Sequence, residues 1–421
     1  MYRFVPSKFF YKIYIFRERK KEKKGGLFRM ISTLRFPMRS HTGLGSIEKL
    51  FVEVRNWNLK KILIVTDQTL VNIGLVDKFL GPLKEELAVS VYSDVEPEPS
   101  LGCAERLVGY TRQEGFDCVL GFGGGSALDL AKLAAVISQN EGDVSDYLNL
   151  TGTRKLERHG IPKILIPTTS GTGSEVTDIA VLSLEGTKDV VTHEYLLANV
   201  AIVDPQLTLT VPKRITAATG IDALTHAVEA FLSINANEAT DALAIKAIEL
   251  ISGAIKTAVE NGADLEARTA MSYGSYLAGL AFFNAGVAGV HALAYPLGSQ
   301  FKLPHGESNA VLLPYVMKHI ASSCPKKMNM VGNILSKHVH ERTAEDFLKL
   351  FFRLVENVGL PTTLKDYGIP ESALDNLTDD AVKQKRLLLR SPKKLNWEDI
   401  YQIYQLAFDG VTNEKGGIYD V

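Results

Sequence analysis

Four side chains in the second half of the chain have the types and spacing of metal ligands. Asp222 and His226 lie four residues apart in the stretch GIDALTH, which reads as helix, so both point from the same helix face. Two more histidines, His291 and His305, follow in a segment punctuated by glycine and proline. One carboxylate and three imidazoles suit a divalent transition metal such as zinc or ferrous iron. The sequence therefore predicts a site for one such ion.

A surface ion pair is the simpler interpretation of Asp222 and His226, and such a pair stabilises a helix only weakly. The residues around both side chains, from Ala223 to Phe231, are largely apolar, which predicts that the helix is buried. His291 lies in a similarly apolar stretch, and His305 sits between Pro304 and a glycine, where we expect a tight turn. Because buried ionisable groups need partners, these surroundings favour the metal site.

Two loops rich in small residues follow consecutive strand-like segments. The first, Gly123-Gly124-Gly125-Ser126, joins a strand to a helix, and its glycines let the backbone approach a phosphate at the helix N-terminus. Serine replaces the third glycine of the dinucleotide fingerprint, and a turn that needs glycine for packing explains this loop equally well. The second loop, from Pro167 to Glu175, carries several hydroxyls. Together the loops favour one ligand that bears phosphate and sugar.

Alternating strand-like and helix-like patterns in the first half predict a parallel sheet with crossover helices. The expected buried strands are 61–66, 89–92, 117–122 and 163–166. Beyond Asp204-Pro205 the patterns are helical, at 222–232, 238–261, 264–283 and 346–358. We therefore expect an α/β nucleotide-binding domain at residues 30–207 and an all-α metal-binding domain at residues 208–421.

Composition limits the class of function. A chain of 421 residues with 46% hydrophobic and 23% charged residues suits a two-domain globular protein. A net charge of −1 gives no electrostatic basis for binding nucleic acid, and no apolar run reaches the roughly 18–20 residues of a membrane span. Three scattered cysteines fit a reducing cytoplasm. Residues 1–29 are expected to form an extra disordered tail, with Met30 as the natural start.

The motifs resemble those of the iron-containing (group III) alcohol dehydrogenases from about Ser32 to the C-terminus. The resemblance is carried by the GGGS loop continued by Asp129 and Lys132, the PTTSGTGSE loop, the Asp222–His226 pair, and the spacing of His291 and His305. It implies a dehydroquinate-synthase-like architecture with the metal between the two domains. The metal ligands that it implies are Asp222, His226, His291 and His305. The cofactor contacts that it implies are Asp67, Gly124, Gly125, Ser126, Asp129, Thr168, Thr169 and Lys188.

Three positions bear on cofactor and substrate choice. Asp67 ends the first main strand, where a carboxylate bonds a ribose 2′-hydroxyl and repels a 2′-phosphate, so we expect NAD rather than NADP. Many members of the family carry a histidine where this chain has Tyr295. With a pKa near 10, tyrosine is a poorer proton carrier, so we expect Tyr295 to change the proton path and substrate choice. Glu98 stands where relatives often have asparagine.

The resemblance implies a metal-dependent NAD-linked alcohol dehydrogenase. It would transfer hydride reversibly between NAD and a primary alcohol or diol (or its aldehyde), as a homodimer or larger homo-oligomer. A hydroxyacid–oxoacid transhydrogenase is the first alternative, and it would show no net use of added NAD. Dehydroquinate-synthase-like lyases share the architecture but match the motifs less well. A non-catalytic metal-binding protein would give no NADH with any alcohol.

Overall fold

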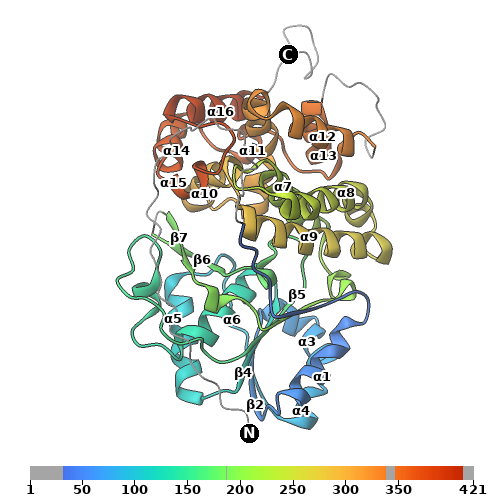
Figure 1. Cartoon of the computed structure of the whole chain (residues 1–421), viewed down its shortest axis with the longest axis vertical. Helices are drawn as coiled ribbons and strands as arrows, with labels where there is room; N and C mark the ends of the chain where they lie inside the picture. Colours follow the sequence, from blue (N-terminus) through green and yellow to red (C-terminus); the bar gives the residue numbers. More distant parts are fainter. Residues whose placement is uncertain (1–31, 186, 338–346, 411–421) are drawn as a thin grey trace, which may run out of the picture. The chain divides into compact units, whose positions relative to one another are not determined.

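A six-stranded sheet organises the N-terminal half, and all of its strand pairs are parallel (Figure 1). The computed structural model describes residues 32–185, 187–337 and 347–410. The predicted tail 1–29 therefore lies outside the described residues. In spatial order the strands are β1 (Arg39–Thr42), β8 (Val200–Val203), β5 (Lys163–Pro167), β4 (Cys118–Gly123), β2 (Lys61–Val65) and β3 (Ala88–Tyr92).

The apolar runs that predicted strands are buried on both faces of this sheet. Alternate side chains point to opposite faces of a strand, so Leu63 and Val65 enter one core while Ile62 and Ile64 enter another. The first core includes residues of two helices that cover that face, α5 (Leu101–Glu114) and α6 (Gly125–Ile137). The other includes residues of α1 (Lys49–Asn56), α3 (Leu75–Leu80) and α4 (Leu83–Glu86). The four predicted strands are thereby confirmed.

Four short strands were not predicted from the sequence. Strands β1 and β8 have four residues each, and an antiparallel hairpin of β6 (Ile179–Leu184) and β7 (Thr187–Thr192) forms a separate sheet. Short strands show too few alternations to reveal a period. Helix α5 has a local start signal, because the Ser100 side chain accepts the Cys103 N–H and so caps the helix.

Helices account for the second half, where the described residues after Val203 contain no strand. Sheet and helical parts occupy opposite halves of Figure 1, and from Leu34 on the chain forms one compact unit. The helices are α7 (Lys213–Leu232), α8 (Glu238–Glu260), α9 (Leu265–Ala285), α10 (Gly289–Phe301), α11 (His305–Ile320), α12 (Pro325–Leu335), α13 (Phe347–Asn357), α14 (Leu374–Ala381), α15 (Lys385–Leu388) and α16 (Trp397–Asp409).

Two local expectations in this half were wrong. The helix expected at 222–232 begins at Lys213, directly after its N-cap residue Pro212, which follows a short 3-10 helix, η5 (Pro205–Thr208). His305, expected in a tight turn, is the first residue of α11. In the described ranges no single helix has the length and hydropathy to cross a membrane; α9 and α10 reach them only jointly, across a bend of 104°.

Candidate metal centre

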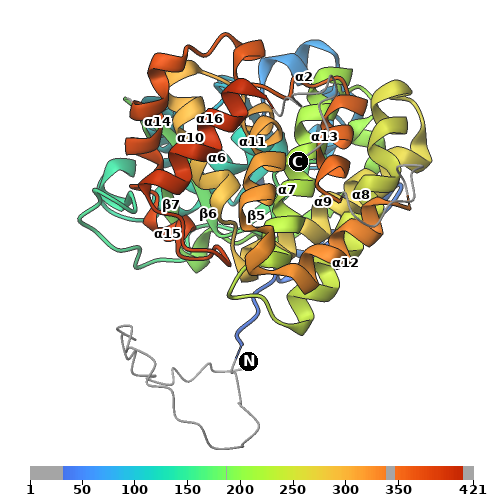
Figure 2. The same cartoon turned by 90° about the horizontal axis from the view of Figure 1, so that it is seen from above.

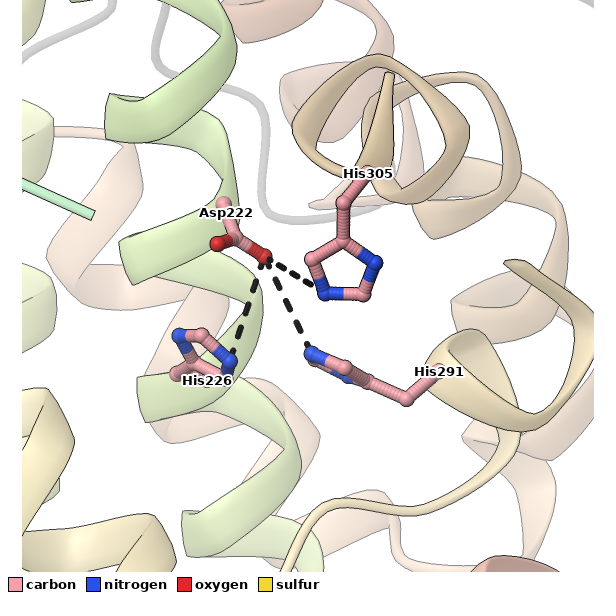
Figure 3. Close-up of side chains that lie close together, drawn as sticks. All are labelled: Asp222, His226, His291 and His305. Atoms are coloured by element: carbon pink, nitrogen blue, oxygen red, sulfur yellow. Dashed lines mark ion pairs between the residues drawn. The ribbon is translucent and has the colours of Figure 1, made fainter. Parts of the chain in front are cut away.

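Three helices bring the four predicted ligands together (Figure 3). Asp222 and His226 project from consecutive turns of α7, His291 comes from the first turn of α10, and His305 begins α11. Asp222, His226 and His291 are at most 5% exposed, so the interpretation as a surface ion pair is excluded. The side chain of His305 is 29% exposed and is the ligand that solvent reaches.

The donor atoms converge on one point. Oδ1 of Asp222 lies 3.9 Å from Nε2 of His226, 3.8 Å from Nε2 of His291 and 3.6 Å from Nε2 of His305. All four donor atoms lie within 4.8 Å of one another. Metal–ligand bonds of about 2.1 Å in a tetrahedron separate the donors by about 3.4 Å. The cluster therefore fits a divalent ion after a small contraction.

A buried carboxylate, Glu229, orients one of these ligands. Its oxygens accept hydrogen bonds from the backbone N–H groups of Ala288 at 3.0 Å and Val290 at 2.6 Å, and lie 2.7 Å from Nδ1 of His291. With the His291 proton on Nδ1 and shared with Glu229, the lone pair of Nε2 points at Asp222. Glu229 thus sets both the ring orientation and the tautomer that a metal requires.

Asn309, one turn after His305 on α11, completes the surroundings. Its Nδ2 lies 2.7 Å from Oδ1 of Asp222 and 3.2 Å from Nε2 of both His291 and His305. An amide N–H can donate to a ring nitrogen only if that nitrogen is unprotonated. The Asn309 contacts are therefore consistent with imidazoles whose Nε2 lone pairs face the centre.

The electrostatic balance favours an anionic Asp222 beside the neutral imidazoles of His226 and His305. Burial lowers the pKa of His226 to about 4 and that of His305 to about 3, against the opposing pull of Asp222. Burial raises the pKa of Asp222, but the three histidines and the Asn309 amide outweigh it, so the net shift is downward. These are the protonation states in which a carboxylate and imidazoles bind a metal.

Several of the predicted cofactor residues gather at one edge of the sheet, whereas Asp129 lies within α6 and Lys188 in β7 of the separate hairpin. Asp67 follows β2, the GGGS loop follows β4 and Thr168 follows β5, and these three strands are neighbours. Gly125 lies so close to Thr172 that a Cβ there would be 2.8 Å from the Thr172 methyl group, which explains the glycine. Thr168 donates its N–H to Gly123, joining the two loops. The carboxyl edge of a parallel sheet is where ligands bind.

Three of these residues have protein partners that the sequence did not reveal. Asp129 accepts from Lys132, from the Ser174 hydroxyl and from the Val181 N–H, so both of its oxygens hold the fold. Lys188 is buried and pairs with Glu98 at 3.0 Å. The Glu98 N–H donates to Oγ of Ser126. Glu98 has a positive φ of 49°, and within the described ranges its buried Oε1 has no hydrogen-bond partner.

Comparison with known proteins gives a consistent result. Residues 37–205 match the model of the family described as iron-containing alcohol dehydrogenase, and residues 216–408 match that of the Fe-containing alcohol dehydrogenase family, C-terminal. Long-chain-alcohol dehydrogenase 1 of Geobacillus thermodenitrificans (strain NG80-2) is 60% identical over 389 residues, which cover 91% of this chain and 98% of that protein. The chain belongs to the iron-containing alcohol dehydrogenase family. It is an oxidoreductase that acts on alcohols, and the family's cofactors are NAD and a divalent metal.

Solved structures support the fold assignment. An alcohol dehydrogenase from Oenococcus oeni has a TM-score of 0.84 and 35% identity, covering 90% of this chain and 100% of that chain. Sulfoacetaldehyde reductase from Bifidobacterium kashiwanohense, solved in complex with NAD+, has a TM-score of 0.82 and 27% identity, covering 90% of this chain and 99% of that chain. The predicted fold class, an α/β domain followed by a helical one, is confirmed.

Sequence reasoning missed two residues that the structure places beside the four-residue cluster. Glu229 lies three residues after His226 and seven after Asp222, so its spacing on one helix face was a usable signal. Asn309 lies four residues after His305, on the same face of α11. Neither was recognised because the helices are apolar nearly all round, so the sequence did not show which face carries the chemistry.

Glu175, the last residue of the second loop, is expected to weaken the fold as the pH rises. Burial raises its pKa from 4.5 to about 7. As the pH rises, the unfolded chain therefore loses this proton before the folded chain does. The resulting loss in the free energy of unfolding is absent below pH 4.5, grows between pH 4.5 and 7, and reaches about 3 kcal/mol above pH 7. Relative to the wild type, Glu175→Gln should gain stability between pH 5 and pH 8 in urea unfolding.

The exposed Glu185 provides the control, and Glu185→Gln should show no such pH dependence. An unfolding difference for Glu175→Gln that stays the same at both pH values would contradict the assignment.

Proposed function

We propose that this protein oxidises a primary alcohol or diol with NAD, and reduces the corresponding aldehyde, at a divalent-metal centre held by Asp222, His226, His291 and His305. The convergence of these four donors from three helices carries the proposal. A metal bound there supplies a Lewis acid that lowers the pKa of the alcohol hydroxyl, and NAD supplies the hydride acceptor. Mixed nitrogen and oxygen donors suit iron and zinc alike, so availability decides between them.

The chain's own residues contribute position and charge. Glu229 fixes the His291 ring, and the partly exposed His305 marks the side from which the substrate hydroxyl enters. The ring of Tyr295 lies 6.1 Å from that of His305. Burial raises the pKa of Tyr295, so at neutral pH it keeps its proton and acts as a hydrogen-bond donor to the substrate oxygen rather than as a base.

The loops at the sheet edge are proposed to hold the cofactor. Gly124, Gly125 and Ser126 surround the N-terminus of α6, where free N–H groups favour a phosphate. Thr168, Thr169, Asp129 and Lys188 stay predicted contacts. Asp67 uses Oδ1 to cap α2 (Gln68–Asn72), and its Oδ2 lies 3.8 Å from where a Gly123 Cβ would be. A carboxylate there favours the free ribose hydroxyls of NAD over the phosphate of NADP.

Other finer properties stay predictions of the sequence. We infer a division near Thr208, with the α/β domain before it and the helical domain after it; this agrees with the gap between the two matched family models. A homodimer or larger homo-oligomer is inferred from the resemblance, and location in the cytoplasm from the three scattered cysteines.

A substrate panel tests the proposal. Metal-free protein is loaded with iron or zinc and given primary alcohols of increasing length, diols and hydroxyacids, with NAD or NADP, and NADH absorbance is followed. Long-chain primary alcohols come first, because the 60% identical relative is named for them. We expect metal-dependent NADH formation, faster than NADPH formation.

Two results would count against the proposal. If the metal-loaded protein formed no NADH from any alcohol, the result would favour a non-catalytic metal-binding protein. Hydride exchange between two added acids without net use of NAD would identify the transhydrogenase instead.

A further inference from the structure

Two arginines near Tyr295 have no anionic partner among the residues that the structure describes. Arg386 lies in α15 and Arg390 just after it, and both side chains are only partly exposed. Among residues 32–185, 187–337 and 347–410, neither guanidinium forms an ion pair or a hydrogen bond, whereas Arg35, Arg39, Arg55, Arg106 and Arg214 each have an acidic partner. A guanidinium carries five donors, and burying them unpaired is costly. The pair is therefore suited to binding an anion.

Packing places Arg390 against the turn between α9 and α10. Helix α9 ends at Gly286, and a Cβ there would lie 2.6 Å from Nε and 2.7 Å from Cζ of Arg390. Gly286 has a φ of +86°, so the turn itself favours the glycine that leaves room for the guanidinium. One turn earlier on α9, Phe282 stacks on the ligand His226 with ring centroids 4.2 Å apart. Arg390 is thus one helical turn from a residue that touches a ligand.

Tyr295 links the two arginines to the four-residue cluster. Helix α15 packs on α10, the helix that carries both His291 and Tyr295 (Figures 1 and 2). The positive charges of Arg386 and Arg390 both oppose the rise that burial causes in the pKa of Tyr295, so both guanidiniums lie within electrostatic reach of its hydroxyl. Tyr295 in turn lies beside His305, the exposed ligand.

Nearby acids do not neutralise the pair. Asp178 is close enough to favour the charged form of Arg390, but it forms its ion pair with Arg35 at 3.4 Å. Asp380, one turn before α15, accepts from Lys383 and Gln300 instead. Burial and the like charge of Arg386 lower the pKa of Arg390, as expected for cations held together without a counterion.

We propose that Arg386 and Arg390 bind an oxyanion carried by the substrate, so that the protein accepts alcohols and aldehydes bearing a carboxylate or sulfonate. The inference rests on the proposed function, because it assigns the far end of a substrate whose hydroxyl lies at the metal centre. Two adjacent guanidiniums recognise carboxylate and sulfonate oxygens through paired hydrogen bonds. Tyr295, between the pair and His305, then contacts the middle of the substrate.

The experiment compares matched substrates on the metal-loaded protein. ω-Hydroxycarboxylates of increasing length are paired with their uncharged primary amides, and 2-hydroxyethanesulfonate is added as the sulfonate. The wild type is compared with Arg386→Met, Arg390→Met and the lysine variants at both positions. Lys394→Met, at an exposed lysine four residues after Arg390, removes the same charge elsewhere. The measured quantity is the ratio of kcat/KM for the anionic substrate to that for its amide.

We expect the wild-type ratio to exceed one at some chain length, and each methionine variant to lower it about 10- to 100-fold, the value of a charge-assisted hydrogen bond. Lysine should restore part of the ratio, because it keeps the charge but not the fork of donors. Lys394→Met should leave the ratio unchanged.

Three outcomes would overturn the inference. The first is a wild-type ratio below one at every chain length. The second is variants that lower kcat/KM equally for the anionic substrate and for its amide. The third is weaker NAD binding in the variants at an unchanged ratio, which would assign the arginines to the cofactor phosphates. None of these three outcomes contradicts the proposed function, provided that neutral alcohols still yield NADH. No NADH from any substrate would instead remove the proposed function.

Discussion

Replacing His291 with alanine is expected to abolish both metal retention and NAD-linked alcohol oxidation. His291 supplies one of four donors and is the one whose orientation is fixed by a buried carboxylate. A site with one donor missing loses affinity, and without the Lewis acid the alcohol hydroxyl keeps its high pKa. A loss of about 4 kcal/mol of transition-state stabilisation is about a thousandfold in kcat/KM. Elemental analysis of the dialysed protein and NADH formation measure the two effects.

A histidine away from the cluster is the control. His159 is exposed and its ring packs at a tilt against that of Tyr195, so His159→Ala should keep both the metal and the activity. Full activity of His291→Ala in metal-free buffer would contradict the four-donor centre.

Changing Glu229 should have the second largest effect. The Glu229 carboxylate is 2% exposed and satisfies two backbone N–H groups and Nδ1 of His291. Glu229→Gln keeps the shape but removes the charge and turns an amide towards N–H donors, so metal affinity should fall about 10- to 100-fold. Glu229→Ala leaves three buried donors unpaired and should also lower the free energy of unfolding by about 3–5 kcal/mol.

Metal titration of the metal-free variants and urea unfolding separate these two effects. Glu238, exposed at the start of α8, provides the matched control, and Glu238→Gln should change neither quantity appreciably. If Glu229→Gln bound metal as tightly as the wild type, Glu229 would be a structural residue without influence on the ligand His291.

The two halves of the cluster were predictable to different degrees. Asp222 and His226 could be joined from their spacing alone, because one turn of helix places them together. His291 and His305 lie far along the chain and were linked to them by residue type and by the family resemblance. Glu229 and Asn309 were missed, since helices buried on all sides carry no amphipathic pattern to mark the face that meets the ligands.

Pairings between distant segments were the least predictable part. Glu98 and Lys188 are 90 residues apart in sequence and meet only because the loop after β3 reaches β7. Arg390 and Gly286 likewise meet through the packing around α9 and α15. Nothing in the local sequence of either pair signals its partner.

The sequence by itself determined the longer elements and the identity of the chemistry. Strand periods, helix caps, the two small-residue loops and the Asp222–His226 spacing are local properties, set by backbone geometry and side-chain type over a few residues. Tertiary structure alone decided which groups lie together: Glu229 on His291, Asn309 on Asp222, and, near Tyr295, two arginines without a counterion in the described part of the chain. The physical reason is that burial and charge pairing depend on packing between elements, and no short stretch of sequence encodes that packing.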